Sequence, residues 1–100
     1  MARFEVFRLR GDDDGLVLDC QADLLVQLAT RFVVPLVPRS NAPPPISRLN
    51  PILIVAGTEH VMMTQFAAAV ETRELGPLVA SLAADDMRIS NALDMLLTGF

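Results

Sequence analysis

The sequence predicts a mainly β fold, a small antiparallel barrel or rolled sheet that ends in one C-terminal helix. Short apolar or alternating runs, separated by Gly- and Pro-containing turns, fill the first two thirds of the chain. One apolar stripe at helical spacing follows near the end. With 52% hydrophobic and 20% charged residues among 100, the composition is that of a globular protein. We expect residues 1–100 to form a single domain.

The first two strands are predicted at Phe4–Leu9 and Leu16–Cys20. The alternation in Phe4–Leu9 shifts phase after Val6, which indicates a bulge or a sharp twist. Between the strands, Gly11–Gly15 carries three adjacent aspartates. A calcium loop of the EF-hand type spaces its acids at alternate positions and ends in glutamate, so we interpret this segment as a solvated turn.

A third strand is predicted at Phe32–Val37, where Pro35 confines it to an edge or a bulge because proline donates no ladder hydrogen bond. Pro38–Pro45 holds four of the seven prolines and is expected to be an extended surface loop. A stiff connector is favoured there over a ligand for an aromatic groove.

The last predicted strands are a buried one at Ile52–Ala56 and another at His60–Thr64, joined by a turn at Gly57–Glu59. Gly76-Pro77 is expected to break the segment that follows. Five short strands then precede one helix, which favours a compact antiparallel barrel.

A C-terminal helix is predicted, but the sequence does not fix its start. Asp85-Asp86 suit a first turn because acids there favour the helix dipole, while residues 82–84 fit either the same helix or an earlier turn. Its apolar stripe comprises Ile89, Leu93, Leu96 and Leu97. Gly99 follows the last helical residue, as glycine commonly does at helix ends. This leaves Phe100 as an aromatic tip on a rigid support, which predicts a partner-binding surface.

Composition narrows the class of partner. The net charge of −4 and the supply of only five aromatic residues, all Phe, argue against direct nucleic-acid binding. No apolar run has the length of a membrane span or a signal peptide. One cysteine, Cys20, fits a reducing compartment. We therefore expect a cytoplasmic protein that contacts neither membrane nor nucleic acid.

The sequence contains few residues that are candidates for catalysis or for binding a metal or cofactor. His60 is the only histidine and is expected to be a half-exposed structural residue, while Cys20 is expected to be an inert thiol in an apolar strand. Met62-Met63 is predicted to fill the core. No glycine-rich phosphate loop or metal-ligand cluster occurs, so no metal site or cofactor is expected. The residues alone indicate a small interaction domain.

Several segments, taken in order, resemble the CcdB family of toxins from toxin–antitoxin pairs. They are 18–25 (LDCQADLL), 31–36 (RFVVPL), 46–48 (ISR), 62–64 (MMT) and the helix 89–97 with Gly99-Phe100. The resemblance covers nearly the whole chain, and its weight comes from order and spacing because no single motif is specific.

The resemblance implies an SH3-like barrel of the CcdB/Kid/MazF type with a C-terminal helix, assembled as a homodimer. It implies a toxin that binds the DNA gyrase A subunit and traps the cleaved DNA complex. A cognate antitoxin with a disordered C-terminal tail would neutralise it. It also implies that the protein has no cofactor and is not an enzyme.

Site residues follow from the same resemblance. Those that match gyrase-contacting positions are Leu24, Leu25, Asp94, Leu97, Thr98, Gly99 and Phe100. Those that match the antitoxin-binding surface are Ile46 and Arg48, which would offer a basic contact to an acidic tail.

Two departures from the family pattern keep alternatives open. Leu97-Thr98 stands where the family has Phe-Trp, and Asp94 stands where it has an amide. The first alternative is therefore a toxin-like protein with a disarmed tip that binds antitoxin without poisoning gyrase. The second is an endoribonuclease toxin of the related fold, for which the candidate catalytic residues are His60, Arg73 and Glu71.

Overall fold

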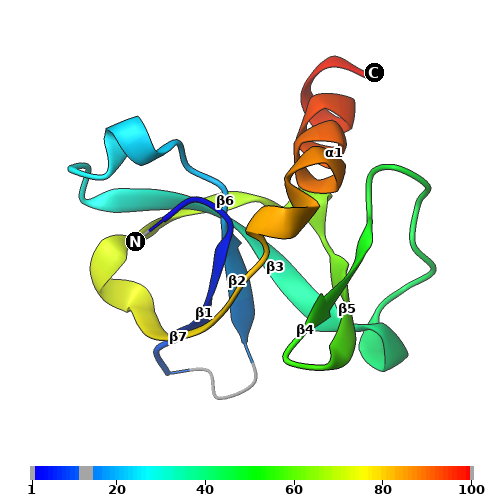
Figure 1. The fold of residues 1–100 in the computed structure, drawn as a ribbon, viewed down its shortest axis with the longest axis horizontal. Helices are drawn as coiled ribbons and strands as arrows, with labels where there is room; N and C mark the ends of the chain where they lie inside the picture. The colour runs from blue at the N-terminus through cyan, green and yellow to red at the C-terminus, as the bar shows by residue number, and fades with distance from the viewer. Residues whose placement is uncertain (1, 12–14, 100) are drawn as a thin grey trace.

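A computed structural model describes residues 2–11 and 15–99 (Figure 1). Asp12–Asp14 of the predicted turn Gly11–Gly15 and the predicted tip residue Phe100 lie outside the described residues. Within them the strands are β1 (Glu5–Leu9), β2 (Leu16–Asp19), β3 (Thr30–Pro38), β4 (Ile52–Val55), β5 (Thr58–Met62), β6 (Ala68–Glu71) and β7 (Leu75–Ser81), and the helix is α1 (Asp86–Thr98).

The described strands form one antiparallel sheet in the order β4-β5-β3-β2-β1-β7, with β6 pairing β3 beside β5. The sheet curls into a half-barrel with α1 on one side (Figure 1), so the predicted fold class is confirmed. The prediction of only five strands was wrong. It missed β6 because Ala68-Ala69 gives no alternation, and it missed β7 because Gly76-Pro77 suggests a break.

The bulge predicted in the first strand is confirmed, since the pairing of β1 with β7 shifts register on both sides of Phe7. Gly76 belongs to β7 for a steric reason. A Cβ atom at this position would lie 2.7 Å from the carbonyl oxygen of Arg8. The glycine therefore permits a close approach of two backbones within the sheet instead of ending it.

The third strand does not lie at an edge, contrary to the expectation from Pro35. β3 pairs with β2 along one side, including Pro35 with Val17. On its other side residues 30–33 pair with β6 and residues 36–38 with β5. Pro35 falls between these two stretches, so a central strand accommodates a residue without an N–H group.

The sequence predicted a fully buried fourth strand, but the structure shows one that is only partly buried. β4 is an edge strand whose burial alternates, and Ile54 is 64% exposed. The turn after it starts earlier than predicted, at Ala56 and Gly57, which have φ angles of +50° and +84°. Two successive positive φ values are typical of the tight hairpin turns that match sheet twist.

Helix α1 begins at Asp86, a start that the sequence left open, and ends at Thr98 as expected, with Gly99 at φ +81° and its N–H donating to the carbonyl of Met95 at 3.0 Å. Its buried residues are Ile89, Ala92 and Leu93. Leu96 and Leu97 were predicted to share this stripe but are exposed, because the helix extends beyond the sheet that covers its inner face (Figure 1). In the described part of the chain no helix has the length and apolar character needed to cross a membrane.

Side chains of the central strands fill two apolar clusters, because successive residues of a strand point to opposite faces. The larger cluster joins Leu18 and Val34 to Ile89 of α1 and includes Met62, while the smaller contains Val17 and Val33. Met62 and Met63 are buried, so the prediction that they fill the core is confirmed.

Candidate partner-binding site

The segment between β2 and β3 presents a group of apolar side chains to solvent. It contains a 3-10 turn, η1 (Asp23–Leu25), in which no residue is buried. Leu24 is 95% exposed and Leu25 48%, and Val26 and Leu28 beside them are about half exposed. An apolar side chain that is almost fully exposed on an ordered turn is typical of an interaction surface.

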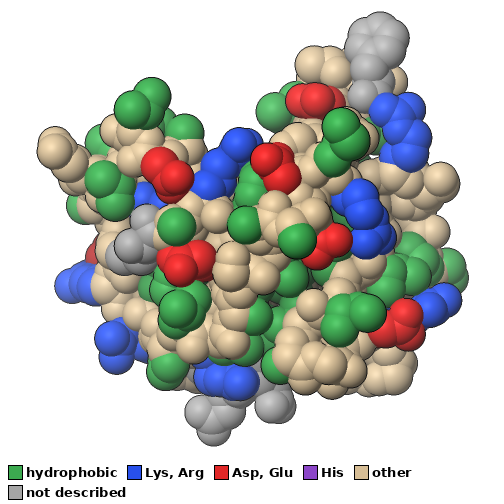
Figure 2. Space-filling view, viewed as in Figure 1, with side chains coloured by type: hydrophobic (Ala, Val, Ile, Leu, Met, Phe, Trp, Pro, Cys, Tyr) green, Lys and Arg blue, Asp and Glu red, His purple; other side chains and the backbone are tan. Residues whose placement is uncertain are grey.

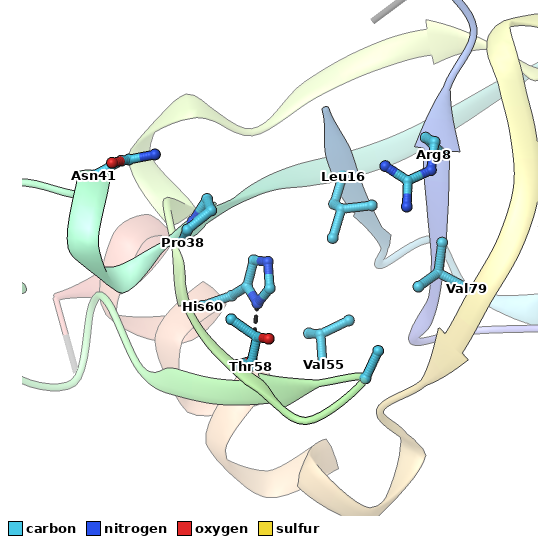
Figure 3. A pocket seen from close by; sticks show the side chains of 9 residues that line it. Arg8, Leu16, Pro38, Asn41, Val55, Thr58, His60 and Val79 are labelled. Carbon is cyan, nitrogen blue, oxygen red and sulfur yellow. Dashed lines mark hydrogen bonds between the residues drawn. The ribbon is translucent and has the colours of Figure 1, made fainter. Parts of the chain in front are cut away.

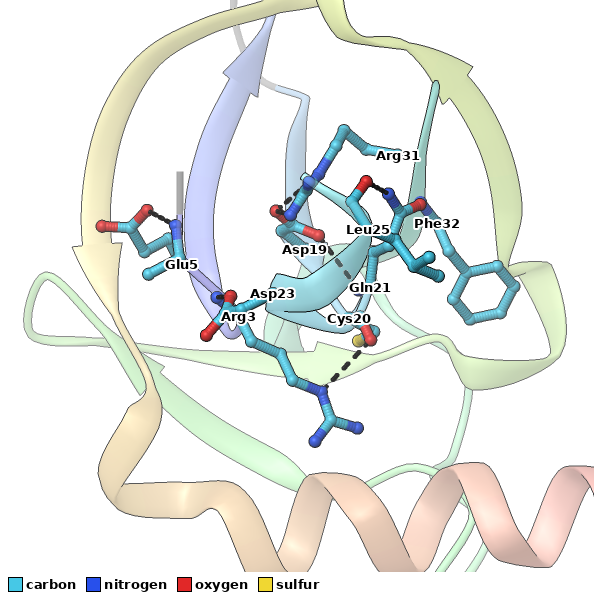
Figure 4. Close-up of polar contacts among 10 residues, drawn as sticks. Arg3, Glu5, Asp19, Cys20, Gln21, Asp23, Leu25, Arg31 and Phe32 are labelled. Atoms are coloured by element: carbon cyan, nitrogen blue, oxygen red, sulfur yellow. Dashed lines mark hydrogen bonds and ion pairs between the residues drawn. The ribbon is translucent and has the colours of Figure 1, made fainter. Parts of the chain in front are cut away.

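A buried polar network supports this turn (Figure 4). The side chain of Gln21 donates from Nε2 to the carbonyl of Leu25 at 3.0 Å and accepts at Oε1 from the N–H of Phe32 at 3.0 Å. The N–H of Gln21 in turn donates to Oδ1 of Asp19 at 3.0 Å. These bonds fix both ends of the exposed segment to the sheet.

The network ends in an ion pair with no exposed surface. Arg31 donates to Oδ2 of Asp19 from Nε at 3.0 Å and from Nη2 at 2.5 Å, and both side chains are 0% exposed. Nη1 of Arg31 has no hydrogen-bond partner among the described residues. A buried charge of this kind depends on its partner, because removing one member leaves the other uncompensated.

Arg3 connects the N-terminal segment to the same turn. Its backbone N–H donates to Oδ1 of Asp23 at 2.7 Å, and its Nε donates to the carbonyl of Cys20 at 3.3 Å. The guanidinium lies over the ring of Phe4, 4.4 Å from the centroid, and points towards α1 in Figure 4. The turn is thereby held from a second direction.

Cys20 is a buried free thiol. Its pKa is raised from 9.0 to about 12, mainly by burial and also by the charge of Asp19, while the charge of Arg3 acts in the opposite direction. The thiol therefore stays protonated at neutral pH, where only the thiolate is an effective nucleophile. The expectation of an inert cysteine is confirmed.

The C-terminal turn of α1 presents the second group of predicted site residues. Leu97 is 74% exposed, and Asp94 and Thr98 are also exposed. The hydroxyl of Thr98 donates to the carbonyl of Asp94 at 2.7 Å. This bond occupies the Thr98 hydroxyl, so Leu97 is the main apolar contact that the described end of the helix offers.

The two groups lie at the same end of the molecule. In Figure 1 η1 and the C-terminal end of α1 both rise above the sheet. Figure 2 shows hydrophobic side chains over each element and a notch between them. The structure thus brings Leu24, Leu25 and Leu97 to one side, on separate supports that flank a hollow.

The residues predicted to bind antitoxin lie on the other flank of α1, in the loop that precedes β4 (Figure 1). Ile46 is 53% exposed, and Arg48 is exposed with a φ of +69°. Buried Asn50 holds the loop, since its Oδ1 accepts from the N–H of Ile46 at 3.0 Å and its Nδ2 donates to the carbonyl of Met62 at 3.0 Å. The loop is therefore an ordered platform.

His60, Arg73 and Glu71, the residues suggested for RNA cleavage, do not lie together in one site. His60 pairs with Pro38 at one end of β3, whereas Glu71 pairs with Thr30 at the other end. Eight residue steps of about 3.3 Å separate these ends by roughly 26 Å. Arg73 forms an exposed ion pair with Glu71, so His60 cannot share a site with either of them within one copy.

His60 instead lines a cavity of about 470 Å³ together with Arg8 (Figure 3). It is only 7% exposed, which corrects the expectation of a half-exposed residue, and its Nδ1 lies 2.9 Å from the carbonyl of Thr58. A neutral ring that donates from Nδ1 keeps Nε2 as an acceptor. Arg8 lies across the cavity in Figure 3.

The supports of the site were missed by reasoning from the sequence. Asp19 and Arg31 are 12 positions apart, and nothing local connects them. The available signal was polar residues placed inside or beside strongly apolar strands, which must be paired if they are buried. Among the described residues no group of three or more His, Cys, Asp or Glu side chains is arranged to hold a metal ion.

The fold and the exposed residues describe a small β protein with ordered apolar side chains at its surface. The model of the family described as "CcdB protein" matches residues 3–99, so the chain belongs to the CcdB family. Family membership supports the coarser part of the functional expectation, a toxin of a toxin–antitoxin pair. None of the curated proteins compared with the chain matches it in sequence.

Two solved structures share the fold. One is an endoribonuclease in complex with its cognate antitoxin from a mycobacterial species, with a TM-score of 0.77 and 18% identity over 97% of this chain and 94% of that chain. The other is an endoribonuclease from a mycobacterial species, with a TM-score of 0.75 and 17% identity over 97% and 90%. Because both are named as enzymes, the expectation that this protein is not an enzyme is contradicted.

Proposed function

We propose that the protein is a toxin that binds the DNA gyrase A subunit and traps the cleaved gyrase–DNA complex. The binding surface would consist of η1 and the C-terminal turn of α1. The observation that carries the proposal is that Leu24 on η1 is 95% exposed and Leu97 on α1 is 74% exposed. Both elements are ordered and lie at one end of the molecule. Rigid supports reduce the entropy lost on binding.

A homodimer belongs to the same proposal. Exposed apolar side chains at this end include Leu24, Leu25, Val26, Leu28, Leu96 and Leu97. A two-fold pair would place two copies of this surface side by side and leave both exposed to a partner. Sedimentation at micromolar concentration tests this, with a mass of twice 10.9 kDa expected.

The proposed antitoxin contacts Ile46 and Arg48 with a disordered acidic tail. The support is their exposure on a loop that Asn50 holds in place, together with the cognate antitoxin bound to one protein of the same fold. We place the protein in the cytoplasm, where gyrase and an antitoxin made beside it would both be encountered.

The test is a gyrase–DNA cleavage assay with gyrase from the protein's own host, comparing the natural protein with Thr98→Trp. Linear DNA with the natural protein supports the proposal, and Thr98→Trp should increase it because a tryptophan anchor is commonly worth about 2 to 4 kcal/mol. Cleavage with Thr98→Trp alone indicates an intact scaffold with a disarmed tip. No cleavage with either protein contradicts gyrase poisoning.

RNA cleavage is a second candidate function, favoured by the cavity that His60 and Arg8 line. RNA hydrolysis needs a proton acceptor and a cation near the scissile phosphate. Nε2 of His60 would supply the acceptor and Arg8 the charge. Two proteins of this fold are named endoribonucleases, although Arg73 and Glu71 lie too far from His60 to take part.

The second candidate is tested by incubating the purified protein with a mixed-sequence RNA in EDTA. Cleavage that is lost in His60→Ala and in Arg8→Gln, but kept in Arg73→Gln, supports this site. Cleavage that survives both cavity variants indicates a contaminating nuclease, and no cleavage by the natural protein excludes this RNA as a substrate.

A further inference from the structure

A pocket of about 230 Å³ lies where the loop before β4 meets α1, lined by Arg48, Pro51, Arg88 and Asn91. Two of the chain's eight basic residues therefore face one small concavity, although the net charge of the chain is −4. All eight are arginines, and the planar guanidinium is the side chain best suited to bind a carboxylate through two parallel hydrogen bonds.

The side chain of Arg88 is held in place by two contacts. Nη2 of Arg88 donates to the carbonyl of Ile52 at 2.6 Å, and its Nη1 lies 3.5 Å from Oδ1 of Asp85. The side chain nevertheless remains 53% exposed. Its ion pair with Asp85 is long and partly solvated, so the positive charge of Arg88 is only weakly compensated.

Arg48 adds a second charge, which no described residue compensates. Its guanidinium has no hydrogen bond or ion pair with any described residue. Its backbone has a φ of +69°, a conformation that is unfavourable for a non-glycine residue and persists only where the surroundings hold it. Two residues further on, Asn50 ties the same loop to the carbonyl of Met62.

We infer that this pocket binds a carboxylate side chain of an acidic peptide segment, with Arg48 and Arg88 as paired cations and the amide of Asn91 as an additional donor. The inference rests on the proposed antitoxin binding and deepens it, because it assigns Arg88 and Asn91 of α1 to the same surface as Arg48. The partner would cross from the loop onto the helix, where Asp94 and Thr98 follow Asn91 on neighbouring turns.

The test measures fluorescence anisotropy of a labelled 12-residue peptide of alternating glutamate and leucine at low salt. Its counterpart with glutamine in place of glutamate is the uncharged control. Arg88→Gln and Arg48→Gln are each expected to weaken binding of the acidic peptide about ten-fold. Asn91→Asp should weaken it similarly, because it places a carboxylate in the pocket without altering the core.

Arg39→Gln is the matched control. Arg39 is 54% exposed and pairs with Glu59 at 3.4 Å, values close to those of Arg88, but it does not line the pocket. It should change binding less than two-fold. Equal losses in Arg39→Gln and Arg88→Gln would overturn the inference in favour of general charge attraction.

Three further results would contradict binding of a carboxylate in this pocket. Equal binding of the glutamine peptide, no binding of the acidic peptide, or displacement of that peptide by an oligouridylate at equal concentration would each overturn the inference. Melting curves of the three pocket variants exclude unfolding as the cause of a loss. Loss of binding in Arg48→Gln but not in Arg88→Gln would overturn the pocket and leave the proposed antitoxin contact at Arg48 standing, so the two failures are distinguishable.

Discussion

The two predicted partner-binding elements expose leucines by different physical means. In the η1 turn, Leu24 is held outward by side chains beneath it, through Gln21 to the buried pair of Asp19 and Arg31. At the end of α1, Leu97 is held outward by helix geometry alone, and the helix stops at a glycine in the left-handed region. One surface depends on long-range contacts and the other on local ones.

This difference predicts different sensitivity to mutation. The η1 turn can be lost through a change at a buried position that touches no partner, because its order comes from a polar network inside the protein. The end of α1 should tolerate such changes, since its backbone hydrogen bonds are satisfied within the helix and at Gly99.

The largest effect is expected from Asp19→Asn. This change leaves the Arg31 charge buried without a compensating carboxylate, which should lower the free energy of unfolding by about 3 to 5 kcal/mol. Urea unfolding of both proteins provides the measurement. A loss below about 1 kcal/mol would show that the pair does not support the fold.

The matching control replaces both charges, as Asp19→Leu with Arg31→Met. Because no unpaired charge remains, this double variant should recover most of the lost stability. If it is as unstable as Asp19→Asn, the loss comes from packing and not from an uncompensated charge.

A smaller and more local effect is expected from Gln21→Leu. The carbonyl of Leu25 and the N–H of Phe32 lose their side-chain partner, at a cost of about 1 to 3 kcal/mol. Hydrogen exchange should accelerate at residues 22–28 and stay unchanged in α1. Uniform acceleration over both elements would contradict the separation of their supports.

At the other element, Gly99→Ala should cost about 1 kcal/mol. Apart from the chain neighbours, no atom of the described residues lies within 4 Å of the added Cβ, so the cost comes from the φ of +81° and not from a clash. For a domain of this size the melting temperature should fall by about 4 to 8 °C, with exchange in η1 unaffected. An unchanged melting temperature would show that the helix end frays without consequence.

The smallest expected effect is that of Gln21→Leu on the reactivity of Cys20, the residue directly before Gln21. Its pKa of about 12 in the folded protein exceeds the unfolded value of 9.0, so folding favours the protonated thiol. The protonated thiol therefore contributes to stability below about pH 9, and this contribution is lost as the pH rises from about 9 towards 12. Iodoacetamide at pH 8 should label the natural protein slowly and Gln21→Leu faster. Equal rates would mean that the turn does not open.

Much of the sheet was predictable because alternation and turn residues are local signals. The first two strands, the bulge near Phe7 and the helix end at Gly99 were all found this way. The central position of β3 and the presence of β7 were not, because Pro35 and Gly76 are compatible with strands only through neighbours distant in sequence.

The candidate site was less accessible from the sequence. Leu24 and Leu97 came from the family resemblance, and no periodic pattern predicts that a leucine will be 95% exposed. Their supports and the pocket of Arg48 and Arg88 depend on contacts between elements 12 to 40 positions apart. Only a folded arrangement reveals such contacts, since sequence periodicity reports which face is buried and not which polar groups meet on it.

The most direct test of the central claim measures binding of purified gyrase A subunit to the natural protein, Leu24→Ser and Leu97→Ser. Both leucines are exposed, so each change should leave stability within about 0.5 kcal/mol. We predict that each variant binds gyrase at least 10-fold more weakly, with an unchanged melting temperature. Undiminished binding in both variants would contradict a surface formed by η1 and the end of α1.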